Sequence, residues 1–290
     1  MELIANEQGY LNLLNFILNN GIKKETRNGF TYSHFGSLLR FNLNNGETFP
    51  LLTTKKVFIR GIIEELLWFL RGSTNSKELE EKGINIWKGN SSREYLDSIG
   101  LFNYPEGELG PIYGFQWRKF NGKIDQIRYV LEELELKNSR RALLSAWNPI
   151  QLKQQALPPC HILYNFYKND DENLSCMMYM RSADLFLGVP FNIASTAILC
   201  MIIAKVMGIK AKDICLSICD NHIYEEHLEQ VKQQLNNEIY KSPQLIIKKD
   251  FDKSKYTSID EKIKWIEELK FEDFDLLNYK SHSTIKAIMK

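Results

Sequence analysis

The stretch of sequence that decides the fold is CHILYNFYKNDDENLSCMMYMRS, residues 160–182. Two runs rich in aromatic and aliphatic residues, CHILYNFYK at 160–168 and LSCMMYMRS at 174–182, flank the polar segment NDDEN at 169–173. Asn and Asp accommodate the tight backbone of a turn, and the flanking runs are typical of strands. This order predicts an antiparallel hairpin.

The register of this hairpin determines which side chains become neighbours. If the four-residue turn covers 169–172, Lys168 faces Asn173 and Cys160 falls opposite Arg181. A guanidinium beside a thiol stabilises the thiolate and lowers the pKa of the thiol. The pairing therefore predicts that the Cys160 sulfur is a nucleophile.

A second interpretation of Cys160 stays open at this point. A cysteine on a strand is often a small buried apolar side chain, and the arginine opposite it then only faces water. A register shift of one residue would also separate the two. Pro158 and Pro159 lack backbone donors and favour a fixed path of the chain into Cys160.

Outside the hairpin, helical and strand-like segments follow one another without regular βαβ alternation, which predicts one mixed α/β (α+β) domain over residues 1–290. We expect a mainly antiparallel or mixed sheet packed by helices. The expected helices lie at 7–20, 57–71, 124–136, 192–207, 224–236 and 259–269. The expected strands outside the hairpin lie at 30–44, 142–148 (buried), 214–220 and 244–249.

The composition restricts the classes of partner. The 290 residues include 37 basic and 36 acidic side chains, a net charge of +1, which argues against a broad electrostatic grip on nucleic acid or an anionic membrane. Binding of the protein's own mRNA has no support in the sequence. Five cysteines and an N-terminus without signal-peptide character predict a reducing compartment, cytoplasmic or nuclear. The apolar stretch 191–208 is interrupted by polar residues, so we expect a buried helix and no membrane span.

The helix expected at 57–71 carries two neighbouring glutamates in different surroundings. Glu64 shares a polar stripe with Arg60 and Arg71, whereas Glu65 lies among apolar side chains. Ionisation is costly there, so the pKa of Glu65 should rise, and such a carboxyl moves protons at neutral pH. The alternative is that Glu65 lies at the edge of the stripe and reaches water.

Few arginines are present, and four of them are candidates for an anion site. Arg27 lies in the turn-like ETRNG, Arg181 is followed by Ser182, and Arg140 and Arg141 precede an expected strand. Consecutive residues on a strand point to opposite faces, so Arg140 and Arg141 serve one site only if one of them reaches a neighbouring subunit. Simple surface solubility is the alternative for each.

No metal site is expected. Cys215, Cys219 and His222 have a ligand-like spacing, but on a strand the two cysteines share a face that His222 does not. The sequence also contains no phosphate-binding glycine loop of the P-loop or GxGxxG type.

Seven motifs, in order along nearly the whole chain, resemble the folate-dependent thymidylate synthase family. They are FPLLTTKK (49–56), EELLWFLRGSTN (64–75), GELGPIYGFQWR (107–118), NSRRALLSAWNP (138–149), LPPCH (157–161), YMRSADLFLGVPFNIAS (179–195) and DNHIYEEHLEQ (220–230). The resemblance implies a thymidylate synthase-like fold and a methyltransferase that converts dUMP to dTMP. The co-substrate would be 5,10-methylenetetrahydrofolate, which supplies the one-carbon unit and a hydride and leaves as dihydrofolate.

The resemblance also implies roles for individual residues. Cys160 would add to C6 of the pyrimidine, Glu65 would manage proton transfers through water, and Tyr113 would help to remove the C5 proton. The implied catalytic set is Cys160, Glu65, Tyr113, Arg181, Asp184 and Asn192. The implied dUMP-binding set is Arg27, Arg140, Arg141, Arg181, Ser182, Asn192, His222 and Tyr224, with Arg140 and Arg141 from the partner subunit of a homodimer. The implied folate-binding set is Trp87, Asp184, Leu187, Gly188 and Phe191.

Asn192 is the residue that indicates the base. A neutral amide donates to O4 and accepts from N3–H of uracil, and cytosine presents the opposite pattern. The related dCMP hydroxymethylases carry an acid at this position, so Asn192 favours dUMP. A helix beginning at this point offers the alternative that Asn192 is only a helix cap.

Several positions depart from the family pattern, and two other functions stay open. The departures are Lys88, Asn165, Met180, Thr196, Cys219, a phosphate loop one residue short and a C-terminal tail one residue short. A pyrimidine hydroxymethylase, in which water replaces the hydride, is one alternative. A weakened nucleotide- or RNA-binding regulator is the other, although Cys160, Glu65 and Asn192 are all present.

Overall fold

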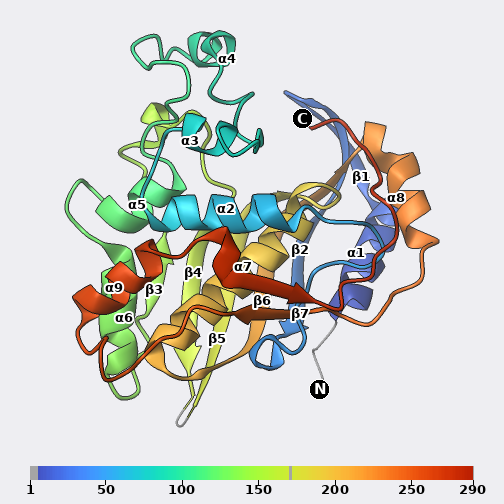
Figure 1. The fold of residues 1–290 in the computed structure, drawn as a ribbon. Coiled ribbons are helices and arrows are strands. Elements are labelled where there is room, and N and C mark those ends of the chain that lie inside the picture. Colours follow the sequence, from blue (N-terminus) through green and yellow to red (C-terminus); the bar gives the residue numbers. More distant parts are fainter. Residues whose placement is uncertain (1–5, 170–171, 290) are drawn as a thin grey trace.

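A six-stranded mixed sheet organises the chain in the computed structural model, which describes residues 6–169 and 172–289 (Figure 1). The strand order is β1-β2-β6-β5-β4-β3, and only the β5–β6 pair is parallel. The strands are β1 (Ile22–Thr26), β2 (Gly29–Asn42), β3 (Leu143–Ser145), β4 (His161–Lys168), β5 (Asn173–Asp184) and β6 (Lys210–Tyr224). The prediction of a mixed, mainly antiparallel α/β fold is confirmed.

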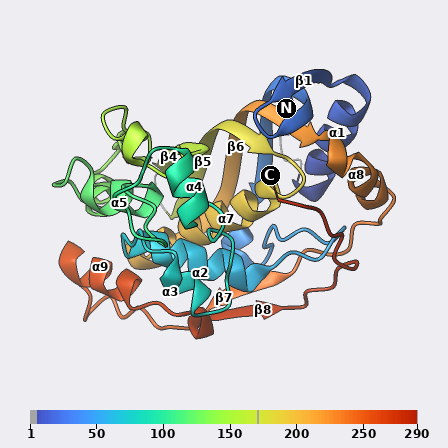
Figure 2. The same ribbon diagram turned by 90° about the horizontal axis from the view of Figure 1, so that it is seen from above.

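The helices gather mostly on one side of this sheet. They are α1 (Asn6–Asn20), α2 (Ile59–Leu70), α3 (Lys77–Glu80), α4 (Arg93–Ser98), α5 (Tyr113–Lys119), α6 (Gln126–Glu135), α7 (Gly188–Met207), α8 (Leu228–Leu235) and α9 (Ile259–Glu267). Helix α7 packs directly on β5 and β6, and α2 packs on α7. The centre of the molecule is therefore three layers deep, as seen from the front in Figure 1 and from above in Figure 2.

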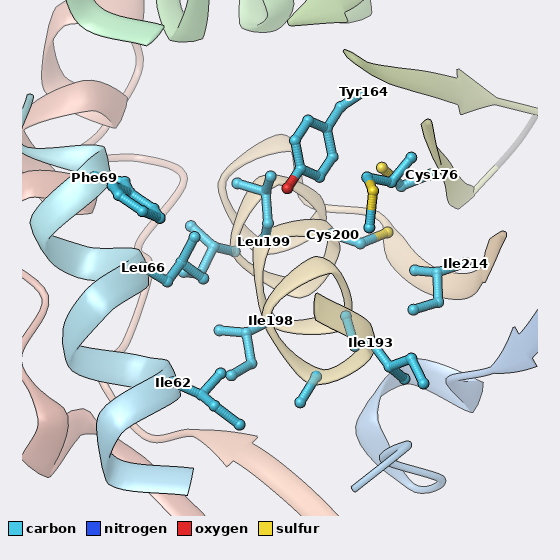
Figure 3. Packing of buried hydrophobic residues seen from close by; sticks show 14 of the residues in the cluster. Ile62, Leu66, Phe69, Tyr164, Cys176, Ile193, Ile198, Leu199, Cys200 and Ile214 are labelled. Atoms are coloured by element: carbon cyan, nitrogen blue, oxygen red, sulfur yellow. The ribbon is translucent and has the colours of Figure 1, made fainter. Parts of the chain in front are cut away.

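The core lies where α7 contacts both neighbours. Ile62 and Leu66 of α2 point toward Ile198 and Leu199 of α7, and Ile214 of β6 lies on the far side of α7 (Figure 3). All five side chains are buried. By length and composition alone α7 would cross a membrane, but 78% of its apolar window is buried inside the protein. We therefore assign it to the core, as the sequence predicted.

The hairpin register differs from the prediction by one residue along most of its length. Lys168 pairs with Leu174, and residues 170–171 of the predicted turn lie outside the described residues. A β-bulge between His161 and Leu163 then shifts the register back. Beyond the bulge, the Arg181 N–H donates to the Cys160 carbonyl at 3.0 Å, so this predicted pair forms nevertheless.

Other predicted elements need correction at their ends. Helix α7 begins at Gly188, so Asn192 lies inside the helix and is not its cap. The buried strand expected at 142–148 is the short edge strand β3, in which Leu143 is 38% exposed. The hydrophobic pattern did not indicate strands β1 and β8. Strand β8 (Phe274–Leu277) pairs with β7 (Gln244–Ile247) in a separate two-stranded sheet.

Candidate active site

Cys160 occupies the position just before β4, where two prolines and an arginine fix it. Arg181 reaches back along the hairpin and donates from Nε to the Pro159 carbonyl at 2.7 Å and from Nη2 to the Pro158 carbonyl at 3.0 Å. The same Nη2 lies 3.6 Å from the Cys160 sulfur. The Cys160 backbone N–H donates to the Tyr113 hydroxyl at 2.7 Å. The thiol and the guanidinium are thus held together, as the predicted pairing required.

The net effect on the thiol is the reverse of the expectation. Burial raises the pKa of Cys160 above its usual value, and the charges of Arg181 and Arg27 act in the opposite direction without overcoming it. The two guanidinium groups are the only nearby cations that favour the thiolate among the described residues. Cys160 is therefore held as a neutral thiol beside the two guanidinium groups that favour its ionisation.

Tyr113 lies at the start of α5 and is almost fully buried. Its ring stacks on the imidazole of His161, with centroids 4.1 Å apart and planes 18° apart. Burial raises the pKa of Tyr113 well above its usual value, and burial lowers the pKa of His161 to about 3. Both rings are consequently neutral at physiological pH. His161 follows Cys160 directly in the sequence. The sequence did not predict its contact with Tyr113, because the orientation of His161 depends on the β-bulge.

Glu65 confirms the predicted rise in pKa. Burial raises the pKa of its carboxyl to about 7, and a hydrogen bond from the Trp87 indole N–H to Oε1, 2.7 Å long, opposes the rise. Glu64 corrects the predicted polar stripe, since it is buried and its carboxylate lies 2.6 Å from the Lys82 ammonium. Glu65 is thus the residue of this pair that is able to gain and lose a proton near pH 7.

The residues assigned to a phosphate and a sugar come from the β1–β2 turn and from strands β5 and β6. Arg27 occupies the tight turn between β1 and β2, and Tyr224 at the end of β6 pairs with Thr31 of β2. Burial raises the pKa of the Tyr224 phenol, and its electrostatic neighbours include Cys160 and Arg27. The neighbouring strand ends carry Ser182 of β5 and His222 of β6. Arg27, Arg181 and Tyr224 are thereby gathered around the thiol.

Arg140 and Arg141 are not part of this group within one chain. Both are exposed, and the Arg141 guanidinium lies 3.7 Å from the Glu133 carboxylate. Neither contributes to the electrostatic surroundings of Cys160. Both precede strand β3, so the argument from alternating strand positions does not apply to them.

Apart from Trp87, which bonds to Glu65 of α2, the residues assigned to the folate lie at or just before the start of α7. The Asp184 Oδ1 accepts the backbone N–H groups of Phe186 at 2.9 Å and Leu187 at 3.2 Å, which shapes the turn into the helix. Leu187, Gly188 and Phe191 are half-exposed, although most of the helix is buried. Asn192 is also half-exposed, and its amide has no hydrogen-bond partner among residues 6–169 and 172–289. This end of α7 therefore offers apolar and polar groups that the described part of the chain leaves unused.

Lys55 is a residue near the site that the sequence analysis did not single out. Its buried ammonium donates to the Phe186 carbonyl and lies 3.5 Å from the centroid of the Phe186 ring. Burial lowers the pKa of Lys55 to about 7, and Asp184 opposes this effect. Only the motif FPLLTTKK marked the position, and its surroundings depend on the packing of α7.

No group of three or more His, Cys, Asp or Glu side chains among the described residues is arranged to hold a metal ion. The five cysteines are all free thiols. The arrangement therefore suits covalent and acid–base chemistry by side chains: a thiol with two cations, a neutral phenol and a carboxyl with a pKa near 7.

Comparison with known proteins supports this assignment. The model of the family described as "Thymidylate synthase" matches residues 8–290. The human thymidylate synthase is 43% identical over 98% of this chain and 90% of its own length. The bifunctional dihydrofolate reductase-thymidylate synthases of Paramecium tetraurelia and Arabidopsis thaliana are each 45% identical, over 98% and 97% of this chain. The chain spans only 61% and 54% of the lengths of those two bifunctional relatives. By family match and by relatives, the chain belongs to the thymidylate synthase family.

Proposed function

We propose that this chain converts dUMP to dTMP with 5,10-methylenetetrahydrofolate as the donor of the one-carbon unit and the hydride. The observation that carries the proposal is the Cys160 thiol, held 3.6 Å from the Arg181 guanidinium and hydrogen-bonded through its backbone to Tyr113. The residues 1–290 would form one catalytic domain. Free cysteines support a reducing compartment, the cytoplasm or the nucleus.

The first step is covalent addition to the pyrimidine. The Cys160 sulfur bonds to C6 of dUMP, and the electron pair of the C5–C6 double bond moves toward O4 as an enolate. The thiol proton must leave before or during the addition, and the pKa of the free thiol is raised. Arg181 and Arg27 favour the thiolate, and they also suit the dianionic phosphate of the nucleotide. Substrate binding therefore brings the sulfur and the activating cations into one ordered group.

The proton transfers fall to Glu65 and Tyr113. With a pKa near 7, the Glu65 carboxyl gives and takes protons at neutral pH through water. Tyr113 lies closer to the sulfur, since its hydroxyl accepts the Cys160 N–H, and it assists removal of the C5 proton. Cys160 would leave C6 only after C5 has taken up the one-carbon unit and lost this proton, and the folate has delivered its hydride to the new carbon.

The folate co-substrate would supply the carbon and the hydride that turn C5–H into C5–CH₃. The residues at the start of α7 fit its flat pterin ring. A Cβ at Gly188 would meet no atom closer than 3.7 Å, so the backbone there is open to a ring, and Leu187 and Phe191 present apolar surface beside it. Asp184 would hold the polar edge of the ring. Trp87 is nearly buried, and its indole N–H already donates to Glu65. It would therefore contact the folate only through its exposed edge.

Asn192 would read the base. Its half-exposed amide is free of protein partners among the described residues and is able to donate to O4 and accept from N3–H of uracil. His222 and Tyr224 would hydrogen-bond the 3′-hydroxyl of the deoxyribose. Ser182 would join Arg27 and Arg181 at the phosphate.

The site would be completed in a homodimer. Leu38 of β2, Leu163 of β4, and Met177 and Tyr179 of β5 lie on one face of the sheet, and each is at least 36% exposed. An exposed sheet face with such apolar side chains suits a second copy of the chain. Arg140 and Arg141 precede Leu143 at the edge of this sheet, where they would reach the partner's phosphate.

The decisive experiment incubates the purified chain with dUMP and 5,10-methylenetetrahydrofolate and determines the mass of the nucleotide product. A gain of a methyl group, with stoichiometric dihydrofolate, supports the proposal. A hydroxymethyl product would identify the chain as a hydroxymethylase. Tight dUMP binding without any turnover would instead favour a regulatory protein.

A further inference from the structure

A buried tyrosine lies behind the imidazole that stacks on Tyr113. The Tyr164 hydroxyl lies 2.9 Å from Nδ1 of His161, and Tyr164 is only 2% exposed. On a regular strand, residues three apart point to opposite faces. The bulge between His161 and Leu163 removes this difference, so that His161 and Tyr164 are both buried on the α7 side of β4.

The imidazole is the one hydrogen-bond partner of this phenol among the described residues. Burial raises the pKa of the Tyr164 phenol well above its usual value, so the phenol keeps its proton at physiological pH. Thr196 of α7 is fully buried as well, but its hydroxyl makes no hydrogen bond among the described residues. The buried proton of Tyr164 therefore depends on His161 for an acceptor.

Two directions of donation are possible between Tyr164 and His161, and they differ in whether the phenol proton is satisfied. If Nδ1 of His161 donates to Tyr164, the phenol proton is left buried without an acceptor among the described residues. If Tyr164 donates to Nδ1, that proton has its acceptor. A buried donor without a partner costs about 1–3 kcal/mol, which favours the second direction.

We propose that Tyr164 fixes His161 as the tautomer that carries its hydrogen on Nε2, so that the imidazole offers an N–H donor beside Cys160 and Tyr113. Nε2 has no hydrogen-bond partner among the described residues, so this donor remains available to a substrate or to ordered water. Tyr164 acts through His161 and is a positioning residue. The role toward a pyrimidine rests on the proposed function, whereas the tautomer itself does not.

The fixed imidazole also holds the neighbouring phenol. Because the Tyr113 ring stacks on His161, a change in the plane of His161 would move the Tyr113 hydroxyl that accepts the Cys160 N–H. A series of short contacts thus runs from Tyr164 through His161 and Tyr113 to the backbone of Cys160.

The tautomer is measured by ¹⁵N NMR of the intact protein labelled on its histidines. The chain contains only five histidines, so a His161→Gln variant assigns the relevant signals by their loss. We expect a protonated Nε2 and a bare, hydrogen-bonded Nδ1 at pH 7. In Tyr164→Phe the two tautomers should both be populated.

Tyr167→Phe is the matched control, because Tyr167 lies on the same strand but is 61% exposed. It should leave the His161 signals unchanged. Hydrogen on Nδ1 in the wild type, or an unaltered His161 spectrum in Tyr164→Phe, would overturn the proposal.

Activity supplies the second readout. Tyr164→Phe should lower kcat about fivefold, the loss of one neutral hydrogen bond, and should leave the KM for dUMP within about twofold. A change confined to KM would contradict a positioning role at the reacting atoms. If the wild type shows the expected tautomer but makes no dTMP, the tautomer assignment stands and the proposed function fails.

Discussion

The two faces of the six-stranded sheet differ in where their partners come from. On the inner face, α7 and α2 cover the strands, and the site residues find one another within the chain, as Cys160 does with Tyr113. On the outer face, Leu38 and Met177 are 50% and 43% exposed, and no described segment covers them. The difference teaches that the side chains around Cys160 find their partners within one chain, whereas the exposed outer face is where the proposed second copy would bind.

The activity of the site should depend most strongly on the Cys160 thiol. Cys160→Ser should lower dTMP formation by at least about a thousandfold, because a hydroxyl is a far weaker nucleophile than a thiolate. The dissociation constant for dUMP should change only a few-fold, since the phosphate and base contacts do not involve the sulfur. Single-turnover assays and calorimetry measure the two quantities, and substantial residual turnover would contradict covalent catalysis by Cys160.

The two faces should also respond differently to loss of an apolar side chain. Leu199→Ala on the inner side should lower the free energy of unfolding by about 2–5 kcal/mol, because it leaves a cavity between α7 and α2. Leu38→Asp on the outer face should leave the secondary structure intact and shift the protein toward single chains. Denaturant titration and sedimentation velocity test the pair, and an unchanged association state in Leu38→Asp would refute the proposed interface.

The buried carboxyl of Glu65 predicts a pH dependence of stability. Because its pKa is raised in the folded chain to about 7, the folded state binds its proton more tightly than the unfolded state does. Its contribution is complete below the unfolded pKa, near 4.5, and is lost as the pH rises through 7. Glu65→Gln should therefore flatten the decline in stability between pH 5 and pH 8, on the order of 2 kcal/mol. An equally steep decline in the variant would exclude Glu65 as its source.

Replacing the amide of Asn192 by a carboxyl group should alter which pyrimidine base the site prefers. Asn192→Asp should reduce the preference for dUMP over dCMP by about one to two decades in kcat/KM, because a protonated Asp gives its hydrogen to N3 of cytosine and accepts from the amino group. The position of Asn192 within α7 already excludes the capping alternative. Measuring both nucleotides with both proteins decides the matter, and an unchanged ratio would defeat the role in base reading.

Mixing of two variant subunits tests whether Cys160 of one chain works together with Arg140 of the other. Arg140→Ala and Cys160→Ser proteins, each crippled alone, should recover activity when mixed, because one site of each mixed dimer has a native Cys160 and a native partner Arg140. Random exchange gives half of the dimers this composition, so recovery should approach about a quarter of the wild-type rate. No recovery, with mixed dimers demonstrated by mass spectrometry, would mean that Arg140 serves its own chain.

The sequence predicted the inner half of the site well, for reasons that can be named. The neighbours of Glu65 along its helix indicated an apolar environment, and the raised pKa followed. Cys160 and Arg181 were paired correctly although the register was wrong, because the β-bulge compensates for the one-residue error. Bulges depend on local backbone geometry and on tertiary packing, and no hydrophobic pattern indicated this one.

The remaining errors have a common physical origin in tertiary contacts. Glu64 was assigned to the solvent side because helical periodicity does not include Lys82, which comes from a later segment and neutralises it. The prediction of a lowered pKa for Cys160 takes account of Arg181 but not of the burial of the thiol. Strand β1 consists of the fully exposed pattern IKKET, which carries no apolar signal and exists because β2 lies beside it.

The pairing of β2 with β6 has a consequence for the order of folding. Thr31 pairs with Tyr224 across about two thirds of the chain, and the entropic cost of closing so long a loop makes such pairings slow. During synthesis, β2 emerges long before its partner and presents an unpaired edge until β6 arrives. The β4–β5 hairpin closes locally and places Cys160 beside Arg181 early. Arg27 reaches the sulfur only when β6 joins β2, so we expect the nascent chain to possess the nucleophile before it possesses the full set of cations.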